Sequence, residues 1–191
     1  MYSQIINALE KENGCSSKDI NFCHEEALKC KDLQIEVEGV GKILFPLDNR
    51  IIQQLQAASS EAKFGLREKT LLDKKIRDSQ EISAEKLKIN YNETSFSHML
   101  KKMRDALGLS EDAELTAHLH NMLVYGPGHF FKEHQDSEKL EGMIASLVIV
   151  LPSAHIGGDL VVNHNTQKYR FHVFLWIGSR RFLRKRSFRR P

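Results

Sequence analysis

Residues 123–162 read LVYGPGHFFKEHQDSEKLEGMIASLVIVLPSAHIGGDLVV, and this stretch decides the fold class. Its apolar runs are short, and turn-forming Gly, Pro, Ser and His residues separate them. The apolar residues do not recur at the spacing of a helix. The same texture extends on both sides, and strands repeating at about 8–12 residues are typical of a sandwich or barrel. The expected strands cover 115–125, 129–136, 143–151, 159–163 and 168–177.

The chain before this stretch mixes helical and strand patterns. Leu33, Ile35 and Val37 alternate with polar residues, which predicts a strand, then a turn at 39–41 and a second strand running into Pro46. The charge-rich segment 59–83 yields no assignment. Helices are expected over 1–13, over 48–58 with Asp48 or Asn49 as the cap, and over 92–107, where apolar residues share one face. The sequence therefore predicts an α+β fold.

Length and charge bound the class of protein. The chain has 191 residues, of which 41% are hydrophobic and 28% charged, as expected for one globular domain. Seven Lys and Arg residues lie in 178–191, and removing their charges from the net +3 leaves −4 for residues 1–177. We expect an N-terminal mixed region over 1–112, a barrel core over 113–177 and a basic tail over 178–191.

The expected cellular location and the redox state of the cysteines follow from three further features. The longest apolar stretch, 145–152, is far shorter than the ~20 residues that a bilayer requires. The N-terminus carries Glu10, Lys11 and Glu12 and has no long apolar core, which argues against a secretory signal and for a cytosolic protein. The cysteines are expected to be free thiols, because their number is odd and they form no CxxC pair: Cys15, Cys23 and Cys30.

His134-Gln135-Asp136 is the candidate site. On a strand, positions i and i+2 face the same side, so the imidazole and the carboxylate could bind one metal ion. The spacing alone is weak evidence, because His24-Glu25-Glu26, expected in a helix, has it as well. A solvated surface pair is the alternative interpretation of His134 and Asp136.

The residues around His134 strengthen the metal interpretation. The stretch from Tyr125 to Gly158 resembles the prolyl 4-hydroxylase-like branch of the Fe(II)/2-oxoglutarate-dependent dioxygenases. Segments 41–47 and 64–78 look like the N-terminal part of the same proteins. The matching features are Tyr125, the turn 126–128, Phe130 and Phe131, His134 and Asp136, Glu138-Lys139, Gly142-Met143, the run 147–152, and Gly157-Gly158.

The resemblance implies a double-stranded β-helix, a jelly-roll-like barrel of two facing sheets. It also implies that His134 and Asp136 bind Fe(II) and that 2-oxoglutarate and O2 are consumed while a protein or small-molecule substrate is hydroxylated. Ascorbate is a further cofactor of this class. Tyr125 looks like the family tyrosine whose hydroxyl binds 2-oxoglutarate; its alternative role is that of a core aromatic residue.

The C-terminal part departs from the family pattern. The family has a distal His as third iron ligand, followed by an Arg or Lys that binds the far carboxylate of 2-oxoglutarate. The candidates are His172 and Arg180, with Lys185 considered as well. Only two expected strands separate Asp136 from His172, where the family has four. The alternative is a truncated or divergent, catalytically inactive relative.

Two other features suggest different functions. His118 and His120 would share a strand face, but nothing near them completes a metal site, so packed or solvated positions are the simpler interpretation. The basic tail, with Phe182 and Phe188, could bind nucleic acid or an anionic surface, and a solvated extension is its alternative.

Overall fold

A computed structural model describes residues 21–66, 69–71 and 73–171. The expected helix 1–13, Cys15, His172, Arg180, Lys185 and the basic tail lie outside these residues. The described chain forms two units: residues 21–34, 89–119 and 161–171 form one, and the second has most of 35–88 together with 120–160. Each unit is described by itself below.

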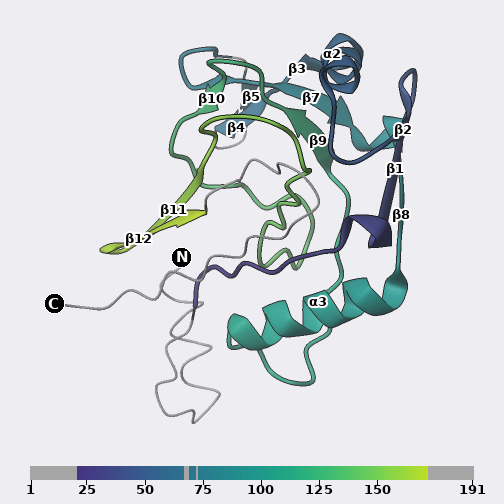
Figure 1. Ribbon diagram of the computed structural model, residues 1–191. Coiled ribbons are helices and arrows are strands. Elements are labelled where there is room, and N and C mark those ends of the chain that lie inside the picture. Colours follow the sequence, from purple (N-terminus) through teal and green to yellow (C-terminus); the bar gives the residue numbers. More distant parts are fainter. Residues whose placement is uncertain (1–20, 67–68, 72, 172–191) are drawn as a thin grey trace, which may run out of the picture. The chain divides into compact units, whose positions relative to one another are not determined.

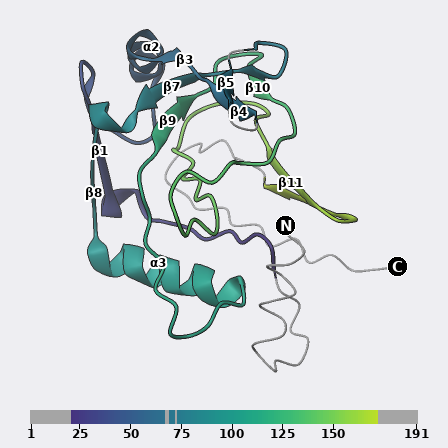
Figure 2. The same ribbon diagram turned by 180° about the vertical axis from the view of Figure 1, so that it is seen from behind.

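The second unit is built from small antiparallel sheets (Figures 1 and 2). β7 (Gln80–Ser83) is the centre of one sheet, between β3 (Ser60–Glu61) and β9 (Asn121–Val124), with Ile82 opposite Met122. β4 (Phe64–Leu66) pairs with β5 (Lys69–Leu71), and β6 (Arg77–Asp78) pairs with β10 (Phe130–Phe131). The buried apolar residues of this unit are Ile35, Val37, Ile43, Leu55, Ala62, Ile82 and Val124.

The strand predicted from period two is confirmed. β1 (Leu33–Val37) buries its three apolar residues and exposes the two polar ones between them. It pairs with β2 (Gly41–Ile43) across a turn at Gly39, whose φ of +78° suits glycine, and β8 (Leu87–Tyr91) lies on its other side. β2 ends before Leu44, so the second strand is shorter than expected. Two short 3-10 helices, η1 (Cys30–Asp32) and η2 (Ala84–Lys86), lead into β1 and β8.

Both central helices begin where the sequence predicts. α2 (Asn49–Ala58) is capped by Asp48, whose Oδ1 accepts from the amide of Ile51 at 2.8 Å, and it buries Leu55. α3 (Glu93–Ala106), in the first unit, is capped by Asn92 and buries Phe96 and Met99. Figure 1 shows the extended segment 21–29 running along α3. A helix around His24 was expected there, and this expectation is wrong.

The strands expected in the C-terminal part form only partly. β9, β10, β11 (Leu160–His164) and β12 (Gln167–Phe171) each lie within or beside an expected strand. Residues 143–151 form no strand. The fold is mixed α+β with several small sheets, and within the described ranges no sheet closes into a barrel. The double-stranded β-helix therefore remains a prediction, as do the boundaries at 112 and 177.

The two cysteines within the described ranges, Cys23 and Cys30, are free thiols, as expected. Cys23 is half-buried, and this burial raises the pKa of its thiol above the ordinary value. Among the described residues, no helix combines the length and the apolar character needed to cross a bilayer.

Candidate metal site

The candidate site begins where β10 ends. β10 pairs with β6 so that Phe131 lies opposite Arg77, and the amide of Lys132 adds one more bond, to the carbonyl of Ile76 at 2.9 Å. Beyond Lys132 the backbone is irregular. The strand expected over 129–136 is therefore limited to two residues, and the same-face argument for His134 and Asp136 does not hold.

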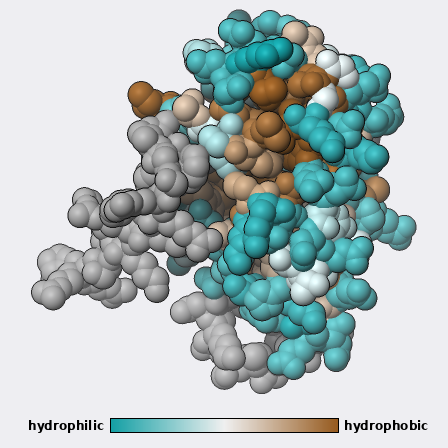
Figure 3. All heavy atoms as spheres, turned by 45° about the vertical axis from the view of Figure 1, so that its right-hand side comes forward, coloured by the Kyte–Doolittle hydropathy of each residue, from teal (hydrophilic) through white to brown (hydrophobic). Residues whose placement is uncertain are grey.

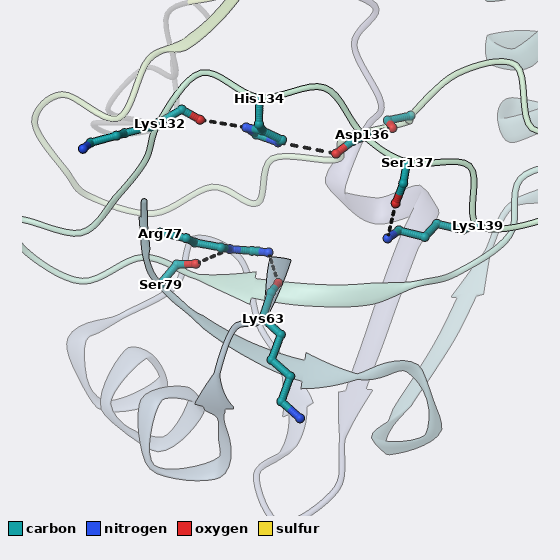
Figure 4. A network of polar contacts seen from close by, with 9 residues as sticks. Lys63, Arg77, Ser79, Lys132, His134, Asp136, Ser137 and Lys139 are labelled. Carbon is teal, nitrogen blue, oxygen red and sulfur yellow. Dashed lines mark hydrogen bonds and ion pairs between the residues drawn. The ribbon is translucent and has the colours of Figure 1, made fainter. Parts of the chain in front are cut away.

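The irregular backbone nevertheless brings the two side chains together (Figure 4). Nε2 of His134 lies 3.4 Å from Oδ1 of Asp136. Nδ1 of His134 lies 2.8 Å from the carbonyl oxygen of Lys132. Because a carbonyl oxygen only accepts, Nδ1 is the donor in this bond, and in the neutral ring Nε2 then carries the free lone pair. The side chains of His134 and Asp136 are 39% and 52% exposed, so solvent reaches both.

Asp136 has a second partner on its other oxygen. The hydroxyl of Ser146 donates to Oδ2 at 2.5 Å, from ten residues further along the chain. One carboxylate oxygen therefore faces His134 while the other is fixed by a neutral hydroxyl. Bonds of this kind orient metal ligands in proteins, because they hold the carboxylate in one position before the ion arrives.

His134 also stacks on an aromatic ring. The rings of Phe131 and His134 have centroids 3.5 Å apart and are tilted by only 20°. The guanidinium carbon of Arg77 lies 4.5 Å from the centroid of the same Phe131 ring. Arg77 is itself buried, with Nε donating to the Ser79 hydroxyl at 2.8 Å and Nη1 to the carbonyl of Lys63 at 2.6 Å.

The donor atoms of His134 and Asp136 fit a shared metal ion. Two atoms 3.4 Å apart can both lie at a bond length of about 2.1 Å from one ion, because their separation is less than twice that length. An imidazole nitrogen and a carboxylate oxygen are ligands of ferrous iron. A third His, Cys, Asp or Glu does not join them within the described part of the chain. The predicted third ligand, His172, lies outside it.

The other candidates within the described ranges form no group of three metal ligands. Tyr125 follows β9 directly and is 47% exposed, and among the described residues no hydrogen bond or ring contact joins it to His134 or Asp136. His118 and His120 are exposed and precede β9, so the strand face that they were expected to share does not form. His24 and Glu26 lie 3.8 Å apart in an extended segment, away from any motif.

Three residues of the site were not predicted: Arg77, Ser146 and the role of Phe131. All three lie in segments that resemble the family, Arg77 in 64–78 and the other two in the stretch from Tyr125 to Gly158. No local pattern links Arg77 or Ser146 to His134, because they are 57 and 12 positions away from it. The stacking of Phe131 on His134 depends on the turn that the backbone makes after β10.

Comparison with known proteins returned no similarity: no protein-family model, curated protein or solved structure matches this chain.

Proposed function

We propose that this chain is an Fe(II)- and 2-oxoglutarate-dependent oxygenase of the prolyl 4-hydroxylase-like type, in which His134 and Asp136 are two of the iron ligands. The observation that carries the proposal is that Nε2 of His134 and Oδ1 of Asp136 lie 3.4 Å apart while the Lys132 carbonyl and the Ser146 hydroxyl hold the two side chains from behind. The bond from Nδ1 to the carbonyl of Lys132 supports it, because this bond leaves Nε2 available as a ligand. The proposed architecture is a double-stranded β-helix.

Each residue then has a defined task. His134 and Asp136 hold the ion, and Ser146 and the Lys132 carbonyl hold these two side chains. Tyr125 and Arg180 are proposed to bind 2-oxoglutarate, Arg180 through the far carboxylate, and His172 is proposed as the third ligand. Bound iron would supply the chemistry that couples decarboxylation of 2-oxoglutarate to hydroxylation of a C–H bond. The substrate is a protein side chain or a small molecule.

A second candidate is a catalytically inactive relative that still binds metal. Two observations favour it: both ligand side chains are open to solvent, and the described residues supply two ligands where the reaction needs three. Such a protein would hold iron weakly and would not turn over 2-oxoglutarate.

Succinate formation from 2-oxoglutarate separates these possibilities. The full chain is incubated with Fe(II), 2-oxoglutarate, ascorbate and air, and succinate is measured. We expect turnover in the wild type that is lost in His134→Ala and in Asp136→Ala. His24→Ala is the matched control, since His24 has the same spacing to an acidic residue, and it should retain full turnover.

If no succinate forms, a measurement of Fe(II) binding distinguishes the remaining explanations. If the wild type binds Fe(II) through His134 and Asp136 but makes no succinate, the protein is the catalytically inactive relative and not an active oxygenase. If His134→Ala binds iron as well as the wild type does, the site assignment itself is wrong.

A further inference from the structure

The stack of Arg77, Phe131 and His134 is the best-defined feature around the candidate ligands. We propose that Phe131, backed by Arg77, is a positioning residue that holds the imidazole of His134 in its metal-binding orientation and so sets the affinity for a divalent ion. The inference rests on the proposed function, because it concerns the affinity of that same site.

The guanidinium of Arg77 has a fixed position at one end of this stack. Its side chain is only 7% exposed, and two hydrogen bonds to Ser79 and Lys63 determine where its guanidinium lies. The pairing of β6 with β10 places Arg77 opposite Phe131, and the guanidinium lies 4.5 Å from the ring centroid. A cation at this distance from an aromatic ring is attracted to it, so Arg77 restrains Phe131.

Phe131 in turn restrains a side chain that has little else to hold it. His134 is partly exposed and belongs to an irregular segment, so packing against a core does not define its rotamer. The bond to the Lys132 carbonyl fixes one ring nitrogen, and stacking at 3.5 Å fixes the plane of the ring. Together the two contacts leave Nε2 facing Asp136.

The ordering of the His134 side chain should increase the affinity for the metal ion. A ligand whose side chain is already ordered loses less rotamer freedom when the ion binds, so binding is tighter. Contacts that orient metal ligands are commonly worth 10- to 100-fold in affinity. We therefore expect loss of the Phe131 ring to weaken binding of the divalent ion by about 10-fold. This is the lower limit of that range, because the bond from His134 to the Lys132 carbonyl remains.

The test measures affinity for Co(II), an air-stable stand-in for Fe(II), by visible absorption on the full chain. Phe131→Leu removes the ring and should raise the dissociation constant about 10-fold. Phe131→Tyr keeps the ring and should bind like the wild type. Phe130→Leu is the matched control. Phe130 is the other residue of β10, points to the opposite face and is 39% exposed. The affinity of this variant for Co(II) should therefore equal that of the wild type.

A second measurement detects the stack without metal. A ring stacked on Phe131 shifts the Hε1 proton resonance of His134 upfield; the resonance is assigned by its absence in His134→Ala. The upfield shift should persist in Phe131→Tyr and Phe130→Leu and vanish in Phe131→Leu. Circular dichroism and unfolding curves show that each variant is folded.

The outcomes separate this inference from the function beneath it. If the wild type binds Co(II) and Phe131→Leu binds it equally tightly, Phe131 has no positioning role while the metal site stands. If the wild type binds no Co(II), the proposed function fails and the inference fails with it, even where the upfield shift is present.

Discussion

Ser146 reaches the candidate site from the irregular run 143–151. Its hydroxyl donates to Oδ2 of Asp136 at 2.5 Å and leaves Oδ1 toward His134. Ser146→Ala removes this donor and frees the carboxylate to rotate, so we expect the dissociation constant for Co(II) to rise about 10-fold. Ser146→Thr keeps a hydroxyl and should bind nearly as tightly as the wild type.

Ser153→Ala is the control for this prediction. The Ser153 hydroxyl contacts a different side chain, at 3.3 Å from Nδ1 of His155, and does not contact Asp136. Equal affinities in Ser146→Ala and Ser153→Ala would show that the Ser146 bond does not orient the ligand.

The candidate ligands could be found from the sequence, but the residues that hold them could not. The spacing of His134 and Asp136 and the stretch around them are local signals. Arg77 and Ser146 act through contacts made by strand pairing and by an irregular segment, and neither leaves a period or a motif in the sequence. The same spacing places His24 and Glu26 within 3.8 Å of each other, so proximity alone does not identify a ligand pair.

At the scale of elements, α3 depends on its N-terminal cap. Oδ1 of Asn92 accepts from the amide of Ser95 at 2.9 Å, which satisfies one of the amides that a helix leaves free at its start. Asn92→Ala should lower the free energy of unfolding by about 1 kcal/mol, measured by urea denaturation. Asn92→Asp keeps an acceptor and should remain close to the wild type; a loss as large as that of the alanine variant would contradict the capping role.

An ion pair between Glu26 and Lys102 links the segment 21–29 to α3. Nζ of Lys102 lies 3.2 Å from Oε1 of Glu26, and this hydrogen bond lowers the pKa of the Glu26 carboxyl. Because the folded pKa is lower than the unfolded one, the stabilisation is complete above about pH 4.3, the ordinary pKa of Glu, and is lost as the pH falls through the folded pKa.

The predicted effect of this pair is small. A partly exposed pair contributes less than about 1 kcal/mol, and salt screens it. Glu26→Gln should therefore reduce the fall in unfolding free energy between neutral and acidic pH by about 0.5 kcal/mol, measured by urea denaturation at low salt. Glu25→Gln, next to it, is the control. An unchanged pH profile in Glu26→Gln at low salt would contradict the assignment.

Elements with a strong local signal were predicted, and elements that need a distant partner were not. β1, α2 and α3 have a clear period or a cap, and their positions match the expectation within a residue or two. In the charge-rich segment 59–83 the strands are only two to four residues long, too short to show a period. The run 143–151 has high strand propensity but pairs with no strand within the described residues, so its composition did not decide its conformation.

At the scale of the whole molecule, the α+β class follows from the sequence, while closure into a barrel does not. A closed barrel requires every strand to find two neighbours, and strand pairing between distant segments cannot be inferred from local patterns. Figure 3 shows apolar residues grouped on the face that it presents. Separately from that view, apolar side chains of a segment without strand partners stay exposed to solvent. In the run 143–151 the exposed ones are Ile144, Leu147, Val148, Ile149 and Val150.

This exposed run predicts how the protein behaves in solution. Among the described residues this run has no strand partner, and it carries no charge. A segment of this kind, rich in Val and Ile, is prone to associate with other copies through its apolar side chains. Val148 and Val150 are 59% and 50% exposed, so replacing both with Lys should leave the fold intact while charge repulsion opposes association. We expect light scattering to show a concentration-dependent rise in mass for the wild type that is strongly reduced in the double variant. Leu44→Lys, at an isolated apolar residue that is 75% exposed, should not reduce it. A rise in mass that persists in the double variant would mean that association depends on another surface.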